Sequence, residues 1–170
     1  MSVFVQIADR MMRRLLDAGV VSTDLLRYGR PGWMPEAAPR AISAEIGDSM
    51  QASDHFGVTT WVTEIRMHLE ARPLQAVHRT PMHAADELMV AVLAALYWGD
   101  RGDAFADDMR ALGVQGYGDA SGHLGADPCA PSRIERDTHS TSTPVGVITL
   151  TLYVRHHVRP GTLSPLTEDA

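Results

Sequence analysis

The sequence predicts an α+β domain in which an antiparallel sheet of about four strands packs against one long helix and one or two shorter helices. Two long segments, residues 59–70 and 147–158, alternate apolar and polar side chains with the period of a β-strand. The segment 81–97 instead repeats apolar residues at helical spacing. Because no strand–helix–strand repeat is present, the pattern favours an α+β fold over a doubly wound sheet.

Helical spacing also marks the start of the chain, where apolar residues recur at every fourth position over residues 3–15. Gly19 follows as a C-terminal stop signal. The long helix begins with Thr80 as its N-cap and Pro81 in its first turn. A third, shorter helix is predicted over residues 105–112.

Four strands are predicted, over residues 42–46, 59–70, 133–138 and 147–158, with Ile134 pointing inward. In the second strand the odd-numbered residues from 61 to 69 are expected to face the core. The other face is expected to meet water, and it carries mainly polar residues: Thr60, Glu64, Arg66, His68 and Glu70.

Three connections separate these elements. Residues 28–39, rich in Pro and Gly, predict an extended arm, and residues 47–57 predict a polar hairpin-type loop. Residues 113–131 predict a Gly-rich loop longer than compact domains usually contain. We therefore expect a single domain over residues 1–158 and a flexible tail over residues 159–170.

The composition narrows the class of function. The formal net charge is -6, and all 15 basic residues are arginine without forming a basic stripe, which disfavours sequence-independent nucleic-acid binding. Cys129 is the single cysteine, so an intrachain disulfide is excluded. No signal peptide or membrane span is expected from the hydrophobic pattern.

An enzymatic alternative rests on the sequence Gly47-Asp48-Ser49 after a predicted strand, which is similar to the opening motif of SGNH hydrolases. That resemblance implies Ser49 as a nucleophile. The other family blocks, including an Asp-x-x-His pair near the end of the chain, are missing. The eight histidines also lack the spacing of a metal site, so we expect no enzyme activity, no metal and no cofactor.

The two long strands suggest assembly. Each spans about 12 residues, or roughly 40 Å, whereas typical strands have about 5 or 6 residues. The one long helix, at roughly 24 Å, is too short to cover such strands from end to end. A neighbouring copy of the chain is the simplest cover for the remainder, since uncovered strands otherwise pair without control.

The order of elements over residues 3–158 resembles that of phage tail terminator proteins, the minor tail protein U and tail-completion group of long-tailed phages and gene transfer agents. The resemblance includes the segment Pro-Arg-Ala-Ile-Ser-Ala-Glu-Ile at 39–46 and Arg133-Ile134-Glu135 before the last strand. It implies a homo-oligomeric ring, expected to be a hexamer, that caps the tail tube and stops its polymerisation. The partners implied are the tube protein and a head-closure or neck protein, with DNA only in transit.

The resemblance also implies a location at the head-tail junction of a virion that assembles in the host cytoplasm, with no membrane partner. We predict interface residues in the two long loops and on the last strand: Asp48, Gln51, Asp54, Tyr117, His123 and Arg155. A second structural hypothesis is another head-tail connector or head-closure protein. The hypothesis of another class is the small hydrolase that uses Ser49, and a third is a generic ligand-binding domain.

Overall fold

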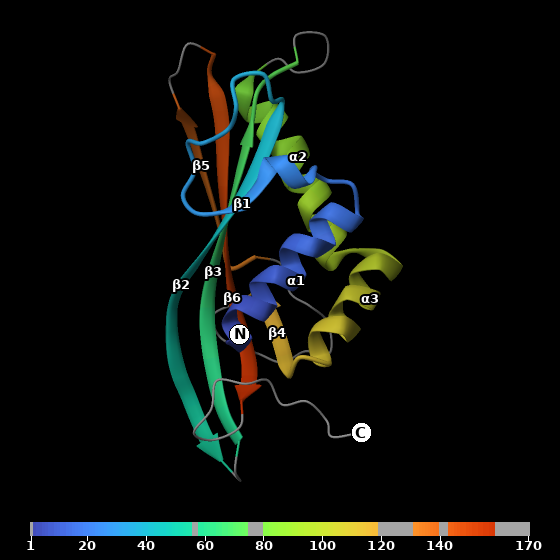
Figure 1. Cartoon of the computed structure of the whole chain (residues 1–170), viewed down its shortest axis with the longest axis vertical. Coiled ribbons are helices and arrows are strands. Elements are labelled where there is room, and N and C mark those ends of the chain that lie inside the picture. The colour runs from blue at the N-terminus through green and yellow to red at the C-terminus, as the bar shows by residue number, and fades with distance from the viewer. Residues whose placement is uncertain (1, 56–57, 75–79, 119–130, 140–142, 159–170) are drawn as a thin grey trace.

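The computed structural model describes residues 2–55, 58–74, 80–118, 131–139 and 143–158 (Figure 1). In chain order the elements are α1 (Val3–Asp17), a 3₁₀ turn (Thr23–Leu25), β1 (Leu26–Tyr28), β2 (Arg40–His55), β3 (Val58–Ala71), α2 (Pro81–Tyr97), α3 (Gly99–Arg110), β4 (Val114–Gly118), β5 (Arg133–His139) and β6 (Val145–Val158). The α+β class is therefore confirmed.

The described strands form one sheet in the order β1-β2-β3-β6-β4, and β5 also pairs with β6. Two strands pair with the same edge of β6: β5 pairs with residues 145–151, and β4 pairs with residues 153–156. The prediction of about four antiparallel strands is corrected in two respects. The sheet has six strands, and β1 pairs with β2 in the parallel direction. Both additional strands, β1 and β4, are too short to show a period in the sequence.

The three helices lie on one face of the sheet, where they enclose the core (Figure 1). Residues at positions 3, 7, 11 and 15 of α1 are buried, as the helical spacing predicts. They pack with the odd-numbered side chains of β3, among which Ile65, Met67 and Leu69 are fully buried. Each such side chain contributes roughly 1.5–3 kcal/mol through burial, so this layer is the main source of stability.

The predicted ends of two helices are confirmed. Gly19 has a φ of 69°, a left-handed conformation that glycine adopts more easily than other residues, directly after α1. At α2 the Thr80 hydroxyl accepts a hydrogen bond from the backbone N–H of His83 at 3.1 Å. The helix predicted over residues 105–112 exists but begins earlier, because α3 spans Gly99–Arg110.

The loop predicted over residues 47–57 is wrong for the most part. Residues 47–55 continue β2 and pair with β3, with register shifts between Ile46 and Ser49 and between Gln51 and Ser53. Polar residues suit a strand here because β2 has no described strand on its outer side beyond Ala44. The loop predicted over residues 113–131 is also shorter than expected, because β4 occupies Val114–Gly118. The rest of this predicted loop, residues 119–130, lies outside the described residues. The predicted tail, residues 159–170, lies outside them as well.

The second face of the sheet is less open than predicted, because the arm at residues 29–39 covers one end of it. The backbone N–H of Gly32 donates a hydrogen bond to Glu70 Oε1 at 2.8 Å, and Glu70 and His68 are buried. A small apolar cluster joins the arm to this face: Met34, Ala38, Ala41, Val145 and Val147. The expectation that His68 and Glu70 meet water is therefore wrong.

The inward orientation predicted for Ile134 is also wrong. β5 is an edge strand, and Ile134 remains 38% exposed there. Its neighbours along β5 are exposed as well, so a single apolar residue among polar ones does not indicate a buried face in this segment.

Candidate interaction surfaces

The residues predicted to form an interface on the first loop lie on the outer part of β2. Asp48 and Gln51 are exposed in this strand. Asp54 pairs through its backbone with Thr59 of β3, while its side chain lies outside the description. The structure therefore places the three positions on one strand, β2.

The other predicted interface residues do not join this surface. Tyr117 is buried on β4, where its hydroxyl donates a hydrogen bond to the Leu96 carbonyl at 2.9 Å. Its ring stacks on Tyr97 and meets Phe105 edge-on. Tyr117 is thus a core residue in the chain, and burial raises the pKa of its hydroxyl.

Arg155 is half-buried on the face of β6 opposite the helices, and its Nε has no hydrogen-bond partner among the described residues. His123 lies outside the described residues. Two of the six predicted positions, Asp48 and Gln51, therefore present described side chains to the surface, and their role as interface residues stays a prediction.

A chain of hydroxyl and imidazole groups crosses the sheet at Ser49. The Ser49 and Thr63 hydroxyl oxygens are 2.9 Å apart, and Thr63 Oγ1 is 3.1 Å from His156 Nε2. A nucleophilic serine needs a base at its own hydroxyl, whereas the imidazole here contacts Thr63. Burial and the neighbouring His157 lower the pKa of His156 to about 4. These contacts connect side chains of β2, β3 and β6, and the Ser49 hydroxyl has no direct contact with His156.

A second polar chain crosses the opposite face of the sheet. His68 Nε2 lies 3.0 Å from Glu45 Oε2, and His68 Nδ1 lies 2.9 Å from Thr149 Oγ1. The hydrogen bond from His68 lowers the pKa of Glu45. The order carboxylate, imidazole, hydroxyl is that of a catalytic triad. None of the three residues lines a pocket described below, so the arrangement fits cross-strand pairing better than catalysis.

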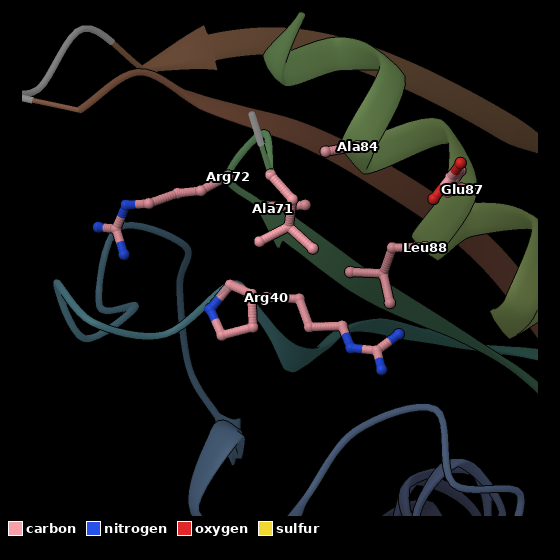
Figure 2. A pocket seen from close by; sticks show the side chains of 8 residues that line it. Arg40, Ala71, Arg72, Ala84, Glu87 and Leu88 are labelled. Carbon is pink, nitrogen blue, oxygen red and sulfur yellow. The ribbon is translucent and has the colours of Figure 1, made fainter. Parts of the chain in front are cut away.

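A pocket of about 230 Å³ opens where β2, β3 and α2 meet (Figure 2). Apolar side chains of Ala71, Ala84 and Leu88 line it, and Arg40 and Glu87 contribute opposite charges. In Figure 2 the Arg72 side chain extends away from α2 toward the arm, where its Nη1 is bonded to carbonyl groups. The pocket is smaller than the roughly 300–1,000 Å³ of typical ligand sites, and it suits a single partner side chain.

The outer side of α2 next to this pocket is apolar. Val90, Ala91 and Ala94 line a shallow depression that His83, Asp86 and Glu87 border. Val90 is 49% exposed, and Trp98 just beyond the helix is 50% exposed. The strip was not predicted, because a helix that covers a sheet is expected to be polar on its outer side. The apolar residues on both sides of α2 were the available signal.

Among the described residues, no group of three or more His, Cys, Asp or Glu side chains is placed to hold a metal ion. In the same part of the chain no helix combines the length and apolar character needed to cross a membrane. No protein-family model matches this chain, and a search of curated proteins finds no match for it either.

Proposed function

We propose that the chain is a structural virion protein, a tail terminator whose ring caps the tail tube, stops its polymerisation and joins the tail to the neck of the head. The proposal rests on the order of elements over residues 3–158, which resembles that family. It includes a ring of identical subunits and contacts with the tube protein and a head-closure protein. It requires no catalytic residue and no cofactor.

The observation that carries the proposal is the outer part of β2. The paired ends of β2 and β3 extend beyond the helices (Figure 1). On β2, the side chains of Asp48, Met50 and Gln51 are exposed. Met50 is 68% exposed and lies between the two register shifts of β2. A strand of this length with an open edge suits a subunit that is completed by other proteins.

Inactivation of the gene in the genome that carries it tests the proposal. A missing terminator leaves tube polymerisation without a stop, so electron microscopy should show tails of irregular and excessive length beside unjoined heads. Tails of normal length that fail to attach to heads would instead favour the alternative, a head-closure or other connector protein.

Complementation with the Ser49→Ala variant separates this function from a hydrolase. The variant keeps the fold of β2 and removes the hydroxyl, so we expect it to restore normal tails as fully as the wild-type chain. Failure of this variant to complement, with the folded protein present at normal level, would support the hydrolase hypothesis.

A further inference from the structure

The helix α2 is apolar on its outer side as well as on the side that it turns to the sheet. From Leu88 to Trp98 the chain carries no charged residue. Val90 is 49% exposed, and Trp98, directly after the helix, is 50% exposed. A helix that only covers a sheet has a polar outer side, whereas a helix that is apolar all round is normally buried. The described residues leave this side of α2 open, so a partner is the expected cover.

The outer strip of α2, formed by Val90, Ala91 and Ala94, lies between two complementary features. At its N-terminal end is the pocket of about 230 Å³, which adjoins the strip at Glu87 (Figure 2). At its C-terminal end is the exposed side chain of Trp98. The pocket has apolar walls and room for one side chain, and an indole is a large apolar side chain with one polar N–H.

These two features are placed symmetrically about the middle of the helix. Trp98 lies seven residues after Ala91, and Ala84, which lines the pocket, lies seven residues before it. Each is therefore roughly 10 Å from Ala91 along the helix, and at about 100° per residue Trp98 is on the same flank of α2 as Ala84 and Glu87. A two-fold axis perpendicular to the helix at Ala91 exchanges the two ends and keeps the flank. It therefore brings Trp98 of one copy to the pocket of the other.

The charges of α2 favour this antiparallel arrangement over a parallel one. Asp86 and Glu87 lie in the first half of the helix, and the second half is uncharged. In an antiparallel pair the acidic half of each helix faces the uncharged half of the other. In a parallel pair Glu87 would face Glu87, which is unfavourable for like charges, and the pocket would receive no indole. The small side chains of Ala91 and Ala94 allow two helix axes to approach to about 8 Å.

We infer that two copies of this chain pair through α2 in an antiparallel, isologous dimer, in which Trp98 of each copy fills the pocket of the other. The occupant is a second copy, because one chain carries both the pocket and the side chain that fits it, at positions that a single two-fold axis matches. Arg40 lines the pocket, so its guanidinium lies beside the indole in the dimer, a favourable pairing of a cation with an aromatic ring.

The dimer is a property of the free chain, and it does not depend on the ring of the proposed function. A contact made mainly through one face of one helix belongs to the small and weak class of protein interfaces. The two copies therefore separate on dilution, and the outer strip of α2 is again exposed in the single chain.

Oxidation of a single cysteine near the axis tests this pairing in the full-length chain, with Cys129→Ser as background. Cysteines are bridged when their Cα atoms lie within about 7 Å. Val90 lies next to the axis, so Val90→Cys should give a covalent dimer. Arg13→Cys, at an exposed position on α1, is the matched control and should stay monomeric. No dimer from Val90→Cys, or as much dimer from Arg13→Cys, would overturn the pairing.

Sedimentation equilibrium under reducing conditions tests the role of Trp98. The mass of the wild-type chain should rise with concentration toward that of two chains. Trp98→Ala should weaken the dimer about tenfold or more, whereas Ile134→Ala, which removes an exposed apolar side chain from β5, should leave it unchanged.

Two results would count against the dimer in this measurement. A wild-type chain that stays monomeric, or that associates as tightly without the indole, would overturn it. An assembly of more than two chains, with no covalent dimer from Val90→Cys, would also overturn it and would leave the ring of the proposed function standing.

Discussion

At the scale of single residues, His156 is the polar group whose burial has the clearest energetic consequence. Its side chain is fully buried between Thr63 of β3 and the ring of Phe4 from α1, with ring centroids 5.2 Å apart for the latter pair. Burial favours the neutral imidazole, and a charge on His157 would oppose a second one beside it. The residue is therefore a neutral member of the core at neutral pH.

We predict that His156 makes the chain sensitive to mild acid. Its pKa of about 4 lies below the value of 6.5 for an exposed histidine. Between these values the unfolded chain binds the proton more readily, so the free energy of unfolding should fall as pH decreases from 6.5 to 4. The loss attributable to this group is about 3 kcal/mol. Urea unfolding at several pH values measures it.

The matched comparison for this effect is a pair of single variants. His156→Gln should unfold more easily at pH 7 but lose less stability on acidification than the wild-type chain. His83→Gln, on the outer side of α2, should keep the wild-type slope. Equal slopes in all three proteins would contradict a neutral buried His156.

At the scale of elements, the contact between α2 and β6 depends on the absence of a side chain at Gly146. A Cβ atom at this position would lie 2.3 Å from the Pro81 carbonyl oxygen at the start of α2. We predict that Gly146→Ala lowers the free energy of unfolding by about 2–3 kcal/mol, because the helix must move away from the sheet. Gly47→Ala is the control, since an added Cβ there would lie 3.2 Å from its nearest atom, Glu64 Cβ, and would meet no backbone atom as close as the Pro81 carbonyl. Urea unfolding should find a cost well below that of Gly146→Ala.

Arg72 makes several of the hydrogen bonds that hold the arm over residues 29–39. Arg72 Nη1 is bonded to the carbonyl oxygens of Pro35, Glu36 and Ala38. We predict that Arg72→Ala lowers the local opening free energy of the arm by about 1 kcal/mol, so that its amides exchange about fivefold faster. Hydrogen exchange with mass spectrometry should find β6 unchanged. The Arg40→Ala control should leave the arm protected, and faster exchange throughout both regions would mean global destabilisation instead.

The sequence predicted the elements whose burial follows a simple period. β3, β6 and α2 each carry a buried face along their length, so alternation or helical spacing marked them. In the outer part of β2, buried and exposed side chains do not alternate regularly, and the Gly, Asp and Ser residues there are typical of turns. Its existence could have been inferred from β3, since Val58–Ala71 needs a partner of similar length. The covering arm and the core position of Tyr117 depend on tertiary contacts that no local pattern contains.

At the scale of the whole molecule, the packed core and the exposed apolar side chains lie in different parts of the fold. The helices and the arm enclose the core, while the two open strand edges, β5 and the outer part of β2, lie at opposite sides of the sheet. The outer strip of α2 is a third exposed surface, with Val90 at its centre.

The exposure of three large apolar side chains predicts that none of them contributes much to the stability of the chain. Met50→Asp and Ile134→Asp together should leave the free energy of unfolding within about 0.5 kcal/mol of the wild-type value, because both side chains are exposed. Val90→Asp, on the outer strip of α2, should cost as little for the same reason. Urea unfolding of the three proteins in dilute solution measures these differences. A loss above about 1 kcal/mol in either variant would contradict the separation between a packed core and exposed apolar surfaces.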